Sequence, residues 1–407
     1  MRRTLTMAVV AAALLVPGGP LPVAEAEAGS AAAPVAVGRW SAREAQSFWT
    51  AERMASAAPL PPVPPGLVDP APPELPEPPE PAEPAEGDPA EPAASADPAE
   101  AIPAATPTPV VTGLPVPSAT PAATPTPTPT PTPTSVATPT RAPSAPAPAP
   151  LPAPARPAVP RLPALTPGIG QNFDGIPVAG RMFLVKSGGT YFCTASVVSS
   201  PGRDLVLTAA HCLLGSDTQQ VAFVPQYTRA KPQPYGMFPV LRDAAGRSKI
   251  WIDPRYRSQG IDRAAALDVA FAQVGPDARG FPVEAVVGGN RLKTGAGYAH
   301  ARVTLIGYPA SAARPRVCVN RTTKFTSADA RIPGSFLRID CTGYPGGTSG
   351  GPFLTGYDAR TGTGDVVGVI GGWKTGGDKA DTSYSSYFGA DIRKLYEKAV
   401  AGAKARR

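Results

Sequence analysis

Histidine is scarce in this sequence, with 2 residues among 407, and the four cysteines never form a Cys-x-x-Cys pair. A structural zinc site needs about four Cys or His ligands at close spacing. The two histidines, His211 and His300, are too few and too far apart to complete such a set. The sequence therefore argues against a zinc site, and we expect neither a metal nor a cofactor.

A long apolar run is also missing. The longest stretch, Leu5 to Val16, is shorter than the ~20 residues that a membrane-spanning helix needs. Two arginines precede it, and residues 24–28 offer small-x-small cleavage sites after it. This pattern predicts a secretory signal peptide over residues 1–28, a secreted mature chain and no transmembrane segment.

Proline, by contrast, is abundant: 38 of the 56 prolines lie within residues 59–167. The first part of this tract is rich in Pro, Ala and Glu, and the second in Pro, Ala and Thr, so neither can bury enough apolar surface to fold. We expect a long disordered linker that reaches on the order of 300 Å if extended as polyproline II. It could contact a cell wall, or it could be a plain spacer.

Charge is divided unevenly along the chain. Residues 59–100 hold ten acidic side chains and neither Lys nor Arg, whereas residues 168–407 hold 30 Lys and Arg against 17 Asp and Glu. The basic residues are scattered, without a tight cluster before the C-terminal tail. We therefore expect a secreted monomer that does not bind nucleic acid.

A short amphipathic helix is predicted within residues 29–58. Ser41 and Glu44 form a capping box, and aromatic residues follow at helical spacing until Pro59. The pattern indicates one helix over residues 42–57. Such a helix is marginal in water by itself, so it either docks on another part of the protein or frays.

Residues 168–407 read as an all-β domain. Short apolar runs, for example at 182–185, 205–207, 221–224, 303–306 and 366–370, alternate with Gly, Pro and Asp. Residues 391–401 place apolar side chains on one face and predict a C-terminal helix. The pattern favours two packed barrels or a large sandwich closed by one helix.

The cysteines all follow residue 190, and an even number in an exported chain predicts two disulfides. Three pairings are possible. Sequential pairing closes two short loops and is preferred, joining Cys193 to Cys212 and Cys318 to Cys341.

Three short stretches carry candidate chemistry. Leu207–Cys212 ends in a histidine whose neighbouring cysteine can pin the turn. Ala266–Phe271 places Asp268 at the mouth of an apolar run, where a buried carboxylate could hold an imidazole in one tautomer. Gly346–Pro352 surrounds Ser349 with glycines, so the backbone can turn sharply and aim its N–H groups at one point. No Lys follows this loop, which argues against a phosphate-binding loop.

Together these stretches resemble the chymotrypsin-like (trypsin-like) serine peptidases, especially their bacterial secreted branch, over residues 175–400. The Thr-Ala-Ala-His-Cys and Gly-Gly-Thr-Ser-Gly-Gly-Pro motifs carry the resemblance. It implies two six-stranded antiparallel β-barrels with the site in the cleft between them, here with a C-terminal helix and a long disordered Pro-rich region in front. It also implies polypeptide substrates.

Roles follow from the resemblance residue by residue. His211 is the general base and then the acid, Asp268 orients its imidazole, and Ser349 is the nucleophile. The backbone N–H groups of Gly347 and Ser349 form the oxyanion hole. Cys193–Cys212 matches the disulfide that clamps the His turn, and Cys318–Cys341 would brace the approach to the Ser loop.

Two departures from the family pattern change the expectations. Thr348 stands where the family has an Asp, so activity should not depend on a freshly exposed α-amino group. Gly343 stands where the trypsin branch has the Asp that binds Lys or Arg. With Gly371, Gly372 and Trp373 as a pocket wall and no histidine there, the pattern favours a small or apolar side chain.

The sequence also offers alternatives for the acid and for the function of the domain. Asp262 is the second candidate for the acid, although it lies in a polar loop with no strand pattern after it. The domain could also be a catalytically silent binding module at the cell wall or surface. An esterase of the α/β-hydrolase type would need alternating helices, which the sequence lacks.

If His211 is the base, it must be neutral, so activity should rise between about pH 6 and 8.

Overall fold

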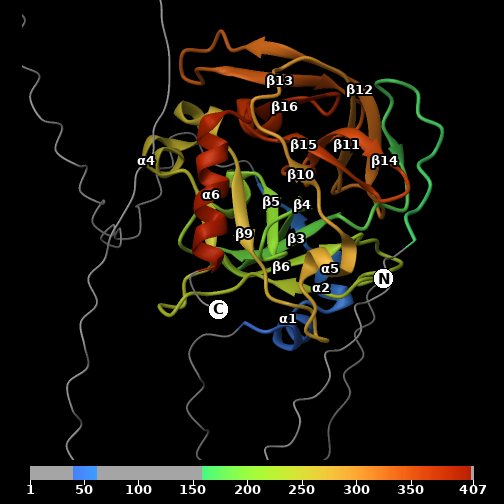
Figure 1. The fold of residues 1–407 in the computed structure, drawn as a ribbon, viewed down its shortest axis with the longest axis vertical. Coiled ribbons are helices and arrows are strands. Elements are labelled where there is room, and N and C mark those ends of the chain that lie inside the picture. The colour runs from blue at the N-terminus through green and yellow to red at the C-terminus, as the bar shows by residue number, and fades with distance from the viewer. Residues whose placement is uncertain (1–39, 62–157, 405–407) are drawn as a thin grey trace, which may run out of the picture. The chain divides into compact units, whose positions relative to one another are not determined.

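The structure is a computed structural model that describes residues 40–61 and 158–404 (Figure 1). The expected signal peptide and most of the expected linker, residues 62–157, lie outside the described residues. The described part is built mainly from two eight-stranded sheets.

The first sheet closes into a barrel. Its strands are β1 (Ala58–Pro59), β3 (Ala179–Lys186), β4 (Gly189–Val198), β5 (Leu205–Thr208), β6 (Gln219–Pro225), β7 (Phe238–Pro239), β8 (Ile250–Ile252) and β9 (Ala270–Gln273). They pair in the order β7-β6-β3-β4-β5-β9-β8. Leu241 donates its N–H to the carbonyl of Gln273, which joins the end of β7 to β9 and closes a ring of six strands.

The second sheet closes in the same way. Its strands are β2 (Gln171–Asn172), β10 (Arg291–Leu292), β11 (His300–Gly307), β12 (Arg316–Thr326), β13 (Ser335–Asp340), β14 (Pro352–Asp358), β15 (Thr363–Val369) and β16 (Thr382–Ser386). The N–H of Gly371, just after β15, donates to the carbonyl of Tyr384 in β16. Two six-stranded barrels are thus confirmed, and each carries two further short strands.

Strand alternation explains how the barrels share a core. Val206 belongs to the apolar cluster of the first barrel, whereas its neighbours Leu205 and Leu207 belong to a second cluster. That second cluster also holds Ile392 and Leu395 of the C-terminal helix α6 (Ala390–Lys404). Since successive side chains of a strand face opposite sides, the same strand fills its barrel and binds the helix. The predicted C-terminal helix is confirmed.

The other helices are short and lie in the connections between strands. They are α3 (Ala210–Leu213), α4 (Pro254–Arg263), α5 (Val283–Val287) and the 3-10 turns η1 (Ala265–Leu267) and η2 (Trp373–Gly376). Among the described residues, no helix combines the length and the apolar character that crossing a membrane requires.

The N-terminal segment differs from the single helix expected over 42–57. It forms two helices, α1 (Ala42–Phe48) and α2 (Ala51–Ser56), because Thr50 caps a new helix with a hydrogen bond from the N–H of Arg53. The Ser41–Glu44 capping box is present as predicted. The segment does not fray: Trp49 is fully buried against the first barrel.

The folded part begins earlier than residue 168. Val159, Leu162 and Leu165, which we expected in the linker, pack against the cluster that contains α6. Both expected disulfides are present, Cys193–Cys212 and Cys318–Cys341.

Candidate active site

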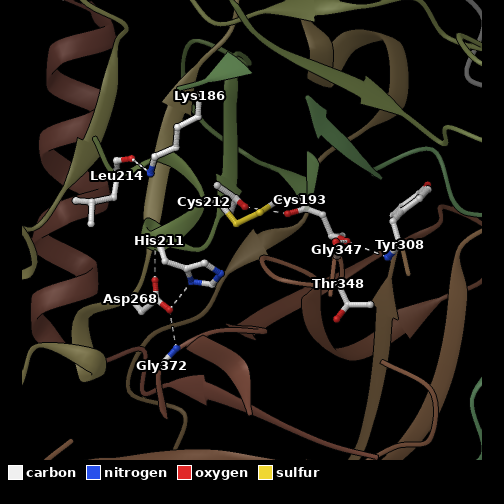
Figure 2. The surroundings of a disulfide bond; sticks show 12 residues. Lys186, Cys193, His211, Cys212, Leu214, Asp268, Tyr308, Gly347, Thr348 and Gly372 are labelled. Atoms are coloured by element: carbon white, nitrogen blue, oxygen red, sulfur yellow. Dashed lines mark hydrogen bonds and ion pairs between the residues drawn. A yellow bond between two sulfur atoms is a disulfide. The ribbon is translucent and has the colours of Figure 1, made fainter. Parts of the chain in front are cut away.

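His211 lies in the first turn of α3, at the end of the first barrel's strand β5. Its side chain is buried, with 5% of the residue exposed. The disulfide between Cys212 and Cys193 ties this turn to β4, with 6.2 Å between the two Cα atoms (Figure 2). The histidine is therefore held by a covalent link one residue away.

Asp268 contacts the imidazole of His211 on its Nδ1 side. Its Oδ2 atom lies 2.8 Å from Nδ1 of His211, and its Oδ1 atom accepts the backbone N–H of His211 at 2.9 Å. Oδ2 also accepts the N–H of Gly372 at 2.8 Å, from the chain that follows β15 (Figure 2). One carboxylate thus connects the two barrels and fixes the ring orientation.

The environment keeps Asp268 ionised. Burial is the largest influence and raises the pKa of Asp268, but the charge and hydrogen bonds of His211 and the N–H of Gly372 outweigh it. The pKa therefore lies below its usual value. Asp262, the second candidate for this role, lies on α4, and the structure pairs His211 with Asp268 instead.

The loop around Ser349 depends on glycine. Gly347 and Gly350 have φ angles of +94° and +81°, a region that disfavours other residues. A Cβ atom at Gly350 would overlap the hydroxyl of Thr208 and the carbonyl of Thr194, beside the turn that carries His211. This close approach brings the Ser349 loop against the His211 turn.

Thr194 anchors the same loop, a contact that the sequence did not reveal. Its N–H donates to the carbonyl of Ser349 at 2.8 Å, and its hydroxyl donates to the carbonyl of Gly347 at 2.9 Å. The hydroxyl accepts the N–H of Tyr308 at 2.9 Å. The only sequence signal was its place directly after Cys193.

Two backbone N–H groups of this loop remain unused. Within the described residues, the N–H groups of Gly347 and Ser349 have no hydrogen-bond acceptor. They are the two groups that the sequence analysis expects to form an oxyanion hole.

The expected pocket residues lie beside this constellation. Gly371 lies against Asp268, and Gly372 donates its N–H to it. The indole of Trp373 packs edge-on against Phe325.

Gly343 has a cationic neighbour. Its carbonyl accepts from Nη1 of Arg316 at 3.1 Å, and a Cβ atom at Gly343 would overlap that guanidinium. The N–H of Gly343 donates to the carboxylate of Asp381 at 3.2 Å, so a cation and a carboxylate both lie beside this residue.

Among the described residues, the side chains that lie close enough together to bind a metal ion do not fit one. Cys193, His211 and Cys212 bring their ligand atoms within 4.8 Å of one another, but the two sulfur atoms form a disulfide and cannot coordinate an ion. His300 lies at the start of β11, where its N–H donates to Thr322, and burial lowers its pKa. It takes no part in the His211 constellation.

Several solved structures are similar to this chain. The protease Anisep from Arthrobacter nicotinovorans is 24% identical, with a TM-score of 0.48 over 57% of this chain and 99% of that one. The thermostable serine protease AL20 from an extremophilic microorganism is 22% identical, with a TM-score of 0.44 over 55% and 97% of the two chains. A Glu endopeptidase solved in complex with MPD is 14% identical, with a TM-score of 0.41 over 57% and 96%.

No curated protein sequence matches this chain. Residues 193–369, however, match the family model of the trypsin-like peptidase domain, and they span His211, Asp268 and Ser349. The folded part of this chain therefore contains a trypsin-like peptidase domain.

Proposed function

We propose that the protein is a secreted serine endopeptidase that cuts peptide bonds through His211, Asp268 and Ser349. The observation that carries the proposal is the Asp268 carboxylate, which bonds His211 of the first barrel and Gly372 of the second. The Ser349 loop lies against the turn that bears His211. These contacts support the assignment of Ser349 as nucleophile, His211 as base and Asp268 as orienting acid, with the N–H groups of Gly347 and Ser349 as oxyanion donors.

The reaction follows from these groups. Nε2 of His211 takes the hydroxyl proton of Ser349, whose Oγ attacks the carbonyl carbon of the scissile bond. The N–H groups of Gly347 and Ser349 receive the oxyanion. His211 then gives the proton to the leaving amine as the C–N bond breaks, which leaves an acyl group on Ser349. Water, deprotonated by His211, releases the acid and restores the serine.

Asp268 acts through His211. Its bond to Nδ1 places the acceptor lone pair on Nε2 and stabilises the imidazolium that forms during each step. Because its pKa lies below its usual value, the carboxylate is charged at neutral pH, which this role requires.

The preferred side chain is proposed to be small or apolar. Gly343 has no side chain that could attract a lysine or arginine, and the guanidinium of Arg316 and the carboxylate of Asp381 beside it are of opposite charge. A library of peptides, incubated with the secreted chain and with its Ser349→Ala variant, tests this proposal. We expect serine-dependent cuts after small or apolar residues, whereas dominant cutting after Lys or Arg would refute the specificity.

Secretion of a monomer is part of the proposal, as is the signal peptide over residues 1–28. The two disulfides favour an oxidising compartment. Mass mapping of the protein from culture medium would give the mature N-terminus. A chain retained inside the cell with its first 28 residues intact would contradict this part.

A silent binding module is the alternative function. It would keep the same fold and would bind polypeptides or wall polymers without turnover. The complete set of chemical groups favours the enzyme, and hydrolysis by the wild type but not by Ser349→Ala would separate the two.

A further inference from the structure

The N-terminal segment, residues 40–61, is bound firmly to the first barrel. Trp49 is fully buried, and its indole N–H donates to the carbonyl of Gln220 at 2.7 Å. The indole of Trp40 donates to the neighbouring carbonyl of Val221 at 3.1 Å. Two aromatic anchors with satisfied N–H groups are typical of a stable interface.

The end of this segment joins the strand that supports the nucleophile loop. β1 pairs in parallel with β4, with Ala58 opposite Tyr191 and Pro59 opposite Phe192. Farther along the same strand, the N–H of Thr194 bonds the carbonyl of Ser349. The two contacts on β4 are two residues apart, or about 7 Å at the usual rise of a strand.

The chain direction brings the segment still closer. Because β1 runs parallel to β4, Leu60 continues toward Cys193, and it packs against the apolar cluster that contains Cys193 and Cys212. A Cβ atom built on Gly346 would lie 3.3 Å from Cβ of Pro59. Pro59 therefore contacts the residue just before Gly347 of the expected oxyanion hole.

The chemistry decides which side of a substrate this segment would meet. His211 must protonate the leaving amine, so the leaving half of the substrate lies on the imidazole side of Ser349. The disulfide beside His211 runs to Cys193, next to Phe192. The leaving half would thus extend toward the part of β4 that β1 already covers.

We propose that Pro59 and Leu60 determine how far a substrate can extend on its leaving side, by occupying the edge of β4 at Tyr191 and Phe192. The inference rests on the proposed peptidase function. Substrates with a small leaving group are cut freely, whereas longer polypeptides must displace β1 and Leu60. The segment is the chain's own occupant of a strand edge that a peptide would otherwise pair with.

Two substrates with the same acyl half test this proposal. One ends in p-nitroanilide, and the other continues for three residues between a fluorophore and a quencher. In the full secreted chain, Leu60→Asp should raise kcat/KM for the long substrate about tenfold and change it less than twofold for the anilide. Leu60→Ala should act in the same direction by a smaller factor, should the charged variant fold poorly. Glu52→Gln, on an exposed position of α2, is the matched control and should change neither.

The outcomes separate the inference from the function. Suppose that wild type and both Leu60 variants cut the anilide, while kcat/KM for the long substrate does not rise in the variants. That result would overturn the inference but would leave the proposed peptidase function in place. A fall in both rates would mean that the segment supports the site, which also overturns it. If wild type cuts neither substrate and Ser349 takes no active-site label, both proposals fail.

Discussion

The backbone N–H of Thr194 donates to the carbonyl oxygen of Ser349 across 2.8 Å. The carbonyl of the same threonine accepts the hydroxyl of Thr208 at 2.8 Å, three residues before His211. One residue of β4 therefore links the strand that leads to the histidine with the loop that carries the serine. We therefore expect the distance between His211 and Ser349 to depend on this link.

Removing the hydroxyl of Thr194 should damage the loop. Thr194→Val keeps the shape but leaves the carbonyl of Gly347 and the N–H of Tyr308 without their partner. We expect the free energy of unfolding to fall by about 1–3 kcal/mol and kcat/KM to fall about 10- to 100-fold through misplacement of the oxyanion donors. Peptide hydrolysis and urea unfolding measure both.

Thr190→Val is the matched control for this change. Thr190 lies on the same strand, is half-buried, and its side chain has no hydrogen bond within the described residues. Equal losses in the two variants would mean that valine in β4, and not the lost hydroxyl contacts, causes the effect.

Neutralising Asp268 should weaken both activity and stability in a pH-dependent way. Because its folded-state pKa is lowered, the charged carboxylate stabilises the fold above the unfolded-state pKa of about 4, and this contribution is lost as the pH falls through the folded-state value. Asp268→Asn should therefore have a lower free energy of unfolding than wild type at pH 7. This difference between the two proteins should shrink toward pH 2. We also expect kcat to fall by about 10⁴ at pH 7.

Urea unfolding of both proteins at several pH values provides the measurement. Asp340→Asn, at an exposed aspartate, is the control and should show no comparable gap. A gap between wild type and Asp268→Asn that stays constant from pH 7 to pH 2 would speak against the buried, charged carboxylate.

Arg181 differs from the ion-paired Asp268, because it is a buried cation without a carboxylate partner in the described residues. Its guanidinium lies over Phe192 at 3.7 Å and over Tyr227 at 4.6 Å from the ring centroids. Burial lowers the pKa of Arg181 to about 10. Burying a charge costs several kcal/mol, and a desolvated cation–π contact returns about 2 kcal/mol. We expect Arg181→Met to be at least as stable as wild type at pH 7, and Arg181→Lys, which keeps the charge without the flat stacking surface, to be less stable.

The sign of the pH effect follows from the lowered pKa. Between about pH 10 and 12 the unfolded chain binds more protons than the folded chain at this residue, so the stability of wild type should rise relative to Arg181→Met. Unfolding curves for the two proteins at pH 8 and pH 11 test this. A difference that moves the other way would show that the rings more than offset the cost of burial.

Thr348 offers no charge with which a new amino terminus could form an ion pair. The residue is buried, and its hydroxyl donates to the carbonyl of Pro345 at 2.8 Å, so the side chain is satisfied locally and carries no charge. Acetylation of the α-amino group at the start of the domain should leave kcat/KM unchanged within about twofold. A large loss would indicate that an ion pair with that amine is needed after all.

The sequence was informative where a motif restricts the chemistry. His211 follows small residues, Ser349 lies among glycines and Asp268 precedes an apolar run, so each can be found from its local sequence. The structure brings these three segments close together. Two barrels followed from the short strands and the family resemblance. Thr194 could not be found in this way, because one threonine in a strand gives no sign that its hydroxyl will meet a loop 153 residues later.

The N-terminal segment shows a second limit. The sequence predicts helical character after Ser41, but not the break at Trp49, where Thr50 caps a second helix and the Trp49 ring packs beside Phe183. The sequence does not show whether the segment docks, since its partner surface is formed by residues of β3, β4 and β6 that come together only in the folded chain. Long-range contacts of this kind are not encoded in a local pattern.

Labelling with a fluorophosphonate tests whether His211 activates Ser349 as a nucleophile. Intact-mass analysis of the secreted protein should show one adduct per chain, and peptide mapping should place it on Ser349. Ser349→Ala should take no label, and His211→Ala should react far more slowly. A folded wild-type protein that remains unlabelled, or a label that persists in Ser349→Ala, would show that Ser349 is not the activated nucleophile.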